Sequence, residues 1–284
     1  MSTLVFTLVL AAACMHAGWN AIVKVVDDRL VSLTLINLVH SGMALLALPF
    51  VAFPAAAAWP FLIASVVIHF GYYVGLIMQY RFGDLSHVYP LARGTAPLLV
   101  AAVAWLWAGE VLDPLSVLAV LLVTGGILSL ALSGRAHAGS RHAVAWALFT
   151  AMMIAGYSLA DGFGGRASGD VLGYIAWLFL LDGLTLLPLL PFLRPPAKLI
   201  PALARHWRGG LAGGVLSTVA YGLVIWAMSQ TPLALVTSLR ETSVIIAAGI
   251  GTLVLGEPFG RRRILAACLV VLGIALLEVA NGIG

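Results

Sequence analysis

The sequence has few charged residues. Only 9% of its 284 residues are charged, whereas 62% are hydrophobic and the mean hydropathy is +1.08. Soluble domains carry about 25% charged residues, so this composition excludes an ordinary soluble protein and predicts one embedded in a lipid bilayer. Of the 15 Lys and Arg residues, 12 lie between hydrophobic runs on one set of loops. That distribution sets membrane orientation and does not indicate nucleic-acid binding.

Cysteine and catalytic motifs are scarce as well. Cys14 and Cys268 lie far apart in hydrophobic runs, which excludes a disulfide framework and a metal-ligand spacing. The chain has no His-Glu-x-x-His motif and no Gly-x-Ser-x-Gly elbow, and Gly162-Phe-Gly-Gly165 lacks a P-loop lysine. We therefore expect no enzyme activity, no metal and no cofactor. Because Met1-Ser-Thr3 carries no basic residue, the first hydrophobic run is expected to be a retained spanning helix rather than a signal peptide.

Hydrophobic segments long enough to cross a bilayer fill almost the whole chain. A spanning helix needs about 20 mostly apolar residues, and short connections leave no room for a soluble domain between the segments. The sequence predicts an all-α membrane protein with ten transmembrane helices at approximately 3–24, 31–53, 60–80, 85–107, 115–133, 143–162, 170–192, 209–229, 233–255 and 262–281. The longest connection, 194–208, contains Pro195 and Pro196 and is expected to be a loop.

The ten segments fall into two groups of five, and an offset of 147 residues relates the third to fifth segments of one group to those of the other, whereas the first two segments repeat less clearly. Five is an odd number, so the second group would enter the membrane from the opposite side, as in the inverted repeats of secondary transporters. We predict two inverted five-helix repeats, 1–134 and 142–284, around a central cavity. The matched pairs are Gly71 and Thr218, Gly75 and Gly222, Arg93 and Arg240, Thr95 and Thr242, Gly109-Glu110 and Gly256-Glu257, and Gly126-Ile127 and Gly273-Ile274.

Loop charges predict the orientation. The loops that follow odd-numbered spans hold 12 basic residues, whereas the other loops and both termini hold only Arg166. Because positively charged loops stay in the cytoplasm, this distribution places both termini outside the cytoplasm.

Two arginines lie inside predicted spans. An arginine near the bilayer centre costs roughly 2.5–3.5 kcal/mol on insertion scales, so it is expected to face protein or water. Tyr89 and Arg93 are four residues apart and share a helix face. The second repeat presents Thr237, Arg240 and Glu241. The last two point about 100° apart on a helix and need not pair with each other.

Other polar side chains within the spans complete a predicted substrate pathway. They form two tiers, one from each repeat, on opposite sides of the membrane midplane. The predicted pathway residues are His16, Trp19, Asn20, Tyr73, Tyr89, Arg93, Tyr157, Asp161, Tyr221, Arg240 and Glu241. The alternative is structural: the histidine, asparagine and tyrosines would pack or anchor, and each arginine would be locked to Asp161, Asp182 or Glu241.

Several further residues receive specific roles. A carboxylate in mid-membrane is costly unless it is paired or protonated, so Asp182, together with His16 and Glu241, is a candidate for proton coupling. Gly71 and Gly75 are expected to allow close helix packing. Glu110 and Glu257 are expected to cap the helix that follows each of them.

These motifs resemble those of the EamA-type members of the drug/metabolite transporter superfamily. The matching segments are Trp107-Ala-Gly-Glu110, Leu255-Gly-Glu-Pro258, Gly125-Gly-Ile127 and Val271-Leu-Gly-Ile-Ala275. The resemblance implies ten helices around a central cavity, alternating access, and export or exchange of small polar metabolites such as amino acids. It also implies a cytoplasmic N-terminus, in conflict with the loop charges.

The sequence therefore predicts a multi-pass secondary active transporter of the cell (inner) membrane. Its expected substrates are small polar metabolites such as amino acids or related organic anions, and its expected assembly is a monomer or homodimer. A passive channel or facilitator and an intramembrane enzyme are the alternatives.

Overall fold

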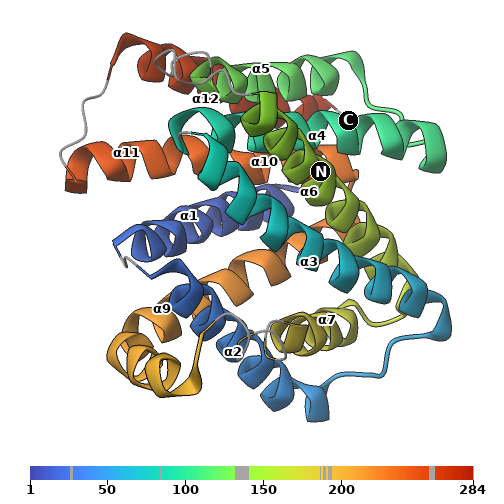
Figure 1. Cartoon of the computed structure of the whole chain (residues 1–284). Coiled ribbons are helices and arrows are strands. Elements are labelled where there is room, and N and C mark those ends of the chain that lie inside the picture. The colour runs from blue at the N-terminus through green and yellow to red at the C-terminus, as the bar shows by residue number, and fades with distance from the viewer. Residues whose placement is uncertain are drawn as a thin grey trace.

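The computed structural model describes residues 1–25, 28–83, 85–131, 141–185, 187, 190, 194–255 and 260–283. In these residues every regular element is a helix (Figure 1). The helices are α1 (Thr3–Val25), α2 (Arg29–Ala47), the short 3₁₀ helices η1 (Leu48–Phe50) and η2 (Ala56–Ala58), α3 (Trp59–Phe82), α4 (Leu85–Ala108), α5 (Pro114–Ala131), α6 (Arg141–Ala167), α7 (Val171–Thr185), α9 (Pro196–Gln230), α10 (Leu233–Glu241), α11 (Ser243–Leu255) and α12 (Arg261–Ile283).

The expected all-α membrane fold is confirmed. Within the described residues, nine helices are long and apolar enough to cross a membrane, and α10 with α11 counts as one of them. The predicted span 170–192 corresponds to α7, which is apolar but only 15 residues long, and part of that range lies outside the described residues. The exact number of spans therefore stays a prediction.

Two element boundaries differ from expectation. The expected loop 194–208 is helical from Pro196 onwards, because Pro196 occupies the first turn of α9, where no backbone donor is needed. The expected single span 233–255 is divided at Thr242. There the backbone N–H and the hydroxyl of Thr242 both donate to the carbonyl of Leu239, at 3.2 and 2.7 Å, which tightens the turn and ends α10.

Small residues bring pairs of helices together. α3 packs along α6, and α9 packs along α1. A Cβ atom on Gly75 would lie 2.7 Å from the Thr150 hydroxyl, and one on Gly71 would lie 2.8 Å from the sulfur of Met153, so the expected packing role of both glycines is confirmed.

The contact between α5 and α12 is reciprocal. A Cβ on Gly126 would approach the carbonyl oxygen of Ala266 to 3.0 Å, and a Cβ on Gly273 would approach that of Ala119 to 2.9 Å. Both glycines and both alanines are related by the offset of 147 residues. This is the contact that two halves related by a two-fold axis would make. The inverted relation of the two halves stays a prediction.

Figure 1 shows how this packing arranges the molecule: α5 and α12 lie at one end, α2, α7 and α9 at the other, and α1 and α10 between them. α10 contacts α1, α4, α5, α6 and α9. The discontinuous span thus lies at the centre, and it carries Arg240 and Glu241.

Candidate functional site

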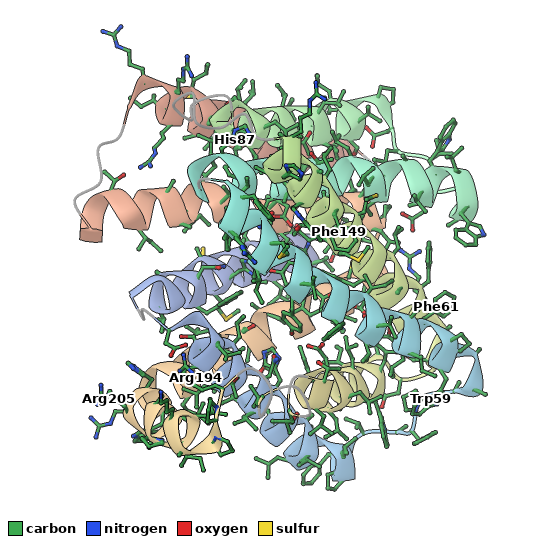
Figure 2. All side chains as sticks on the ribbon, in the orientation of Figure 1. Trp59, Phe61, His87, Phe149, Arg194 and Arg205 are labelled. Atoms are coloured by element: carbon green, nitrogen blue, oxygen red, sulfur yellow. The ribbon has the colours of Figure 1, made fainter. Side chains whose placement is uncertain are left out.

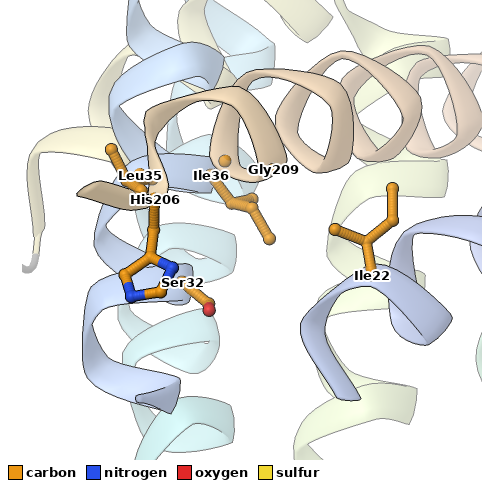
Figure 3. A pocket seen from close by; sticks show the side chains of 7 residues that line it. Ile22, Ser32, Leu35, Ile36, His206 and Gly209 are labelled. Carbon is orange, nitrogen blue, oxygen red and sulfur yellow. The ribbon is translucent and has the colours of Figure 1, made fainter. Parts of the chain in front are cut away.

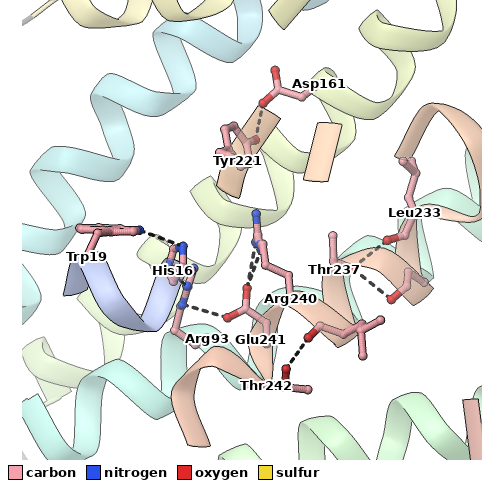
Figure 4. A network of polar contacts seen from close by, with 12 residues as sticks. His16, Trp19, Arg93, Asp161, Tyr221, Leu233, Thr237, Arg240, Glu241 and Thr242 are labelled. Carbon is pink, nitrogen blue, oxygen red and sulfur yellow. Dashed lines mark hydrogen bonds and ion pairs between the residues drawn. The ribbon is translucent and has the colours of Figure 1, made fainter. Parts of the chain in front are cut away.

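The two predicted arginines meet at one carboxylate in the interior. Arg93 on α4 and Arg240 and Glu241 on α10 are each at most 3% exposed. Arg93 Nε lies 2.9 Å from Glu241 Oε2, in an ion pair, and Arg240 donates from Nε and Nη2 to Glu241 Oε1 at 3.2 and 2.9 Å (Figure 4). Arg240 and Glu241 thus pair with each other, although their spacing on the helix does not require it. Both side chains are long enough to turn toward each other at the last turn of α10.

One end of this network comes from α1. His16 contacts Arg93 through Nε2, Trp19 Nε1 donates to His16 Nδ1 at 3.3 Å, and Asn20 donates to the His16 carbonyl at 2.8 Å. Arginine and indole are both donors, and a neutral imidazole accepts at one nitrogen only. His16 therefore accepts from one of these two donors at a time. We call His16, Trp19, Arg93, Arg240 and Glu241 the arginine network.

Aromatic rings line the guanidinium groups. The Tyr89 ring lies 5.6 Å from Arg93, and the rings of Tyr157 and Tyr221 each lie 5.9 Å from Arg240. These distances fall within the range of cation–π attraction, which contributes roughly 0.5–2 kcal/mol per contact. The rings can hold a cation in place without neutralising its charge.

Charge in the network is unbalanced. Within the described residues, the ion pairs of Arg93 and Arg240 both involve the single carboxylate of Glu241. Two guanidinium groups and one carboxylate leave one positive charge uncompensated in a buried site. Because attraction between unlike charges strengthens in a medium of low dielectric constant, this site is suited to an anion.

Asp161 lies next to the network without joining it directly. Its carboxyl accepts from Tyr174 at 3.1 Å and from Tyr221, so the Tyr221 ring stands between Asp161 and Arg240. Sequence reasoning did not identify Tyr174. The spacing of polar residues along α7 does not mark the face on which Tyr174 lies. The sequence signal for it would have been a tyrosine within an apolar helix, because a buried tyrosine hydroxyl usually has a hydrogen-bond partner.

Tyr73, the remaining predicted pathway residue, lies in a separate group with Asp182, a predicted candidate for proton coupling. Asp182 on α7 accepts from Tyr73 on α3 at 2.9 Å, and the same hydroxyl lies 3.3 Å from Asn37 Oδ1 on α2. Asp182 takes part in no ion pair within the part of the chain that the structure describes. We call Asn37, Tyr73 and Asp182 the Asp182 cluster; sequence reasoning missed Asn37.

Glu110 links the two halves of the chain instead of capping the helix that follows it. Its Oε2 accepts from the backbone N–H of Leu233 at the start of α10, at 2.9 Å, and its Oε1 pairs with Arg166 at 2.6 Å. Arg166 also donates to the carbonyls of Met228 and Thr231. Asp113 caps α5 instead, because its side chain accepts a hydrogen bond from the backbone N–H of Ser116 at 2.9 Å. Glu257 lies outside the described residues.

Loops after the second and sixth spans are bonded to each other on the same face as Glu110. Ala52 N donates to Asp170 Oδ2 at 2.8 Å, and Ala55 N donates to the Ser168 carbonyl at 2.9 Å. On the opposite face, Asp28 pairs with Arg194. Partial burial raises the pKa of Asp28, but the hydrogen bonds from Arg194 and from the Val31 N–H lower it by more. The net pKa of Asp28 is therefore below its usual range.

A surface pocket on the Asp28 face lies apart from the network. It is lined by Ile22, Ser32, Leu35, Ile36, His206, Gly209 and Gly210, as Figure 3 shows. None of these residues belongs to the predicted pathway.

These observations define a multi-helix membrane protein with a charged network at its centre. Residues 141–279 match the model of the EamA-like transporter family. This match supports an EamA-type transporter of the drug/metabolite transporter superfamily, a membrane protein embedded in a lipid bilayer.

Solved structures share the fold. One, described only as a crystal structure of a protein, is 17% identical, covers 99% of this chain and 98% of its own, and superposes with a TM-score of 0.68. At this identity the likeness concerns the fold alone. No curated protein matches the chain.

Proposed function

We propose that the chain is a secondary active transporter, an exporter or exchanger, of small polar metabolites that carry an anionic group. The carboxylate of an amino acid or of a related organic acid fits this description. The observation that carries the proposal is the uncompensated positive charge of the arginine network, where two buried guanidinium groups share Glu241.

A substrate anion would compete with Glu241 for the guanidinium groups. Arginine donates two parallel hydrogen bonds to a carboxylate or phosphonate. Here Arg240 donates two hydrogen bonds to Glu241, whereas Arg93 contacts the same carboxylate in an ion pair. An entering anion can therefore replace one of these contacts without leaving a charge unpaired. Exchange of one anionic partner for another keeps the site occupied without requiring tight binding.

Alternating access would use the contacts between the two halves. Glu110 with Arg166, and Ala52 with Asp170, close the face of the termini and the even-numbered loops. Opening of this face would break these contacts, while the network stays near the middle of the membrane, as in other transporters with a midplane site. We place this cycle in the cell (inner) membrane.

Transport assays with purified protein in liposomes test the proposal. The panel contains radiolabelled amino acids, dicarboxylates and a phosphonate, each measured with and without the same compound on the opposite side. We expect saturable flux of at least one compound. We expect Arg93→Ala and Arg240→Ala each to lower it at least tenfold, because removal of one partner of a buried charge pair costs about 2–5 kcal/mol.

The matched control is Arg205→Ala, since Arg205 is exposed on α9 and points away from the molecule in Figure 2. It should leave the flux unchanged. Unchanged flux in both Arg93→Ala and Arg240→Ala would contradict the assignment of the site, and flux that does not saturate would favour a passive channel.

A further inference from the structure

A second buried polar group, the Asp182 cluster, lies between α2, α3 and α7. Asn37, Tyr73 and Asp182 are 2, 8 and 4% exposed. The Tyr73 hydroxyl lies 2.9 Å from Asp182 Oδ2 and 3.3 Å from Asn37 Oδ1. The three residues come from helices of both halves, so any change in this contact is coupled to the relative position of the halves.

The hydrogen bonds that can form in this cluster depend on whether Asp182 carries a proton. A carboxylate oxygen and an amide oxygen are both acceptors, and a tyrosine hydroxyl has one proton to donate. With an ionised Asp182, the Tyr73 proton can satisfy only one of its two neighbours as they are oriented. With a proton on Asp182 Oδ2, that group donates to the Tyr73 oxygen and Tyr73 donates to Asn37 Oδ1. The orientation in the structure thus fits a protonated Asp182.

Unpartnered atoms nearby support an exchangeable occupant. Asp182 Oδ1, Asn37 Nδ2 and both ring nitrogens of His40 are buried without a hydrogen-bond partner in the part of the chain that the structure describes. Buried polar atoms without partners are uncommon in proteins and call for an explanation such as an exchanging proton or water.

The ionisable groups that face Asp182 are known from each packed helix. Tyr73 on α3 contacts Asp182 and His69 on α3 acts on it electrostatically, while the buried His40 on α2 and Asp161 on α6 and the partly buried Tyr221 on α9 lie on helices that pack against α7. No arginine or lysine is among them. Within the described residues, an ionised Asp182 would therefore have no arginine or lysine as a partner, and only the His69 imidazole could become a cation beside it; such a carboxylate is costly in a membrane.

We propose that Asp182 is a proton-binding site of the transporter, separate from the arginine network, and that Tyr73 and Asn37 report its charge by reorienting. When the proton leaves Asp182 Oδ2 for water, the Tyr73 hydroxyl turns to donate to the carboxylate. The Asn37 amide then turns over so that Nδ2 donates to the Tyr73 oxygen. A sodium site is a poorer fit, because hard cations take about six oxygen ligands, whereas the cluster as defined contributes three oxygen-bearing side chains.

A path of aromatic rings joins this site to the arginine network. The Tyr73 ring lies 5.6 Å from Tyr72, Tyr72 lies 5.7 Å from Tyr157, and Tyr157 lies 5.9 Å from the Arg240 guanidinium. Reorientation of Tyr73 can therefore be transmitted by packing to the proposed substrate site. Coupling of proton and substrate flux rests on the proposed function, whereas proton binding by Asp182 does not.

Infrared spectroscopy of the purified protein without substrate tests proton binding directly. A protonated carboxylic acid has a carbonyl stretching band that an ionised carboxylate lacks. We expect such a band near neutral pH in the wild type, its loss in Asp182→Asn, and no change in the control Glu278→Gln, whose side chain is exposed on α12. Tyr73→Phe should shift the band, because it removes the hydrogen-bond partner, and it serves if Asp182→Asn does not fold. An identical band in Asp182→Asn or an unshifted band in Tyr73→Phe would overturn the proposal.

Liposome transport tests the coupling for whichever compound of the panel is carried. Asp182→Asn should lose accumulation driven by a pH gradient and keep exchange of labelled for unlabelled compound. Gradient-driven accumulation at the wild-type level in this variant would overturn the coupling role. Absence of any flux in the wild type would contradict the proposed function. Proton binding by Asp182 would then be tested by the infrared experiment alone.

Discussion

Glu241 decides the balance of charge at the scale of single residues. It is completely buried, and both guanidinium groups contact it. Its counterpart in the first half, at the offset of 147, is Gly94. One glutamate is therefore shared by two arginines that are 147 residues apart, and its removal would leave two unpaired positive charges.

Glu241→Gln should therefore lower stability and strengthen anion binding. Loss of one partner from a buried pair costs about 3–5 kcal/mol, so we expect a lower Tm in sodium chloride. Sodium glutamate or methylphosphonate at equal ionic strength should then raise the Tm of this variant more than that of the wild type. Thermal unfolding of purified protein measures both effects, with Glu278→Gln as control. An equal rise in variant and wild type would contradict the role of Glu241 as the competitor of the anion.

Sequence reasoning found the charged residues of the site but not their pairing. Arg93, Arg240 and Asp182 are conspicuous because a charge within an apolar run is costly. Asn37 and Tyr174 are ordinary polar residues in a helix, and only the packing of α2 and α7 shows their partners. The pairing of Arg240 with Glu241 depends on rotamers at a helix end, which sequence spacing does not fix.

At the scale of elements, Glu110 ties the loop before α5 to the start of α10. It accepts from the Leu233 N–H and pairs with Arg166, whose other donors reach the end of α9. The contact crosses from one half to the other. It is therefore a candidate for a bond that must open during transport.

Glu110→Gln should make the face of the termini open more often. The pair is partly exposed, so we assign it only about 1 kcal/mol, a roughly fivefold change in an opening equilibrium. In a background without Cys14 and Cys268, a cysteine at Thr231, which is 6% exposed, should react about fivefold faster with a maleimide when Glu110 is replaced. Asp113→Asn is the matched control, because Asp113 caps α5 within its own half. The same labelling rate in Glu110→Gln and Asp113→Asn would show that the Glu110 contact does not control opening of this face.

Elements were predicted well where hydrophobicity decides, and less well where backbone geometry does. The spans came within a few residues of α1 to α6, because length and hydropathy define a bilayer-crossing helix. The break at Thr242 carries no Gly or Pro signal, since it results from the Thr242 hydroxyl bonding to Leu239. Pro196 was interpreted as a helix breaker, although in the first turn it is compatible with α9.

At the scale of the molecule, the reciprocal contacts of Gly126 with Ala266 and of Gly273 with Ala119 support two halves related by a two-fold axis. Such an axis in the membrane plane would exchange the two faces of the membrane. Five spans in each half would then place the loop between α5 and α6 on the side opposite the C-terminus. The loop charges predict that this loop lies in the cytoplasm, whereas the family resemblance predicts that it lies outside.

Labelling of single cysteines in intact cells distinguishes these arrangements. Val111, 77% exposed before α5, and Arg141, exposed at the start of α6, lie on opposite faces if one span separates them. Because 12 basic residues lie on the Arg141 side, we expect a cysteine at Val111 to react with a membrane-impermeant maleimide, and one at Arg141 to react only after permeabilisation. The opposite result would place the N-terminus in the cytoplasm and show that these loop charges do not set the orientation. Equal accessibility at both positions would contradict a spanning α5, and with it the inverted five-helix halves on which the central position of Arg93 and Arg240 depends.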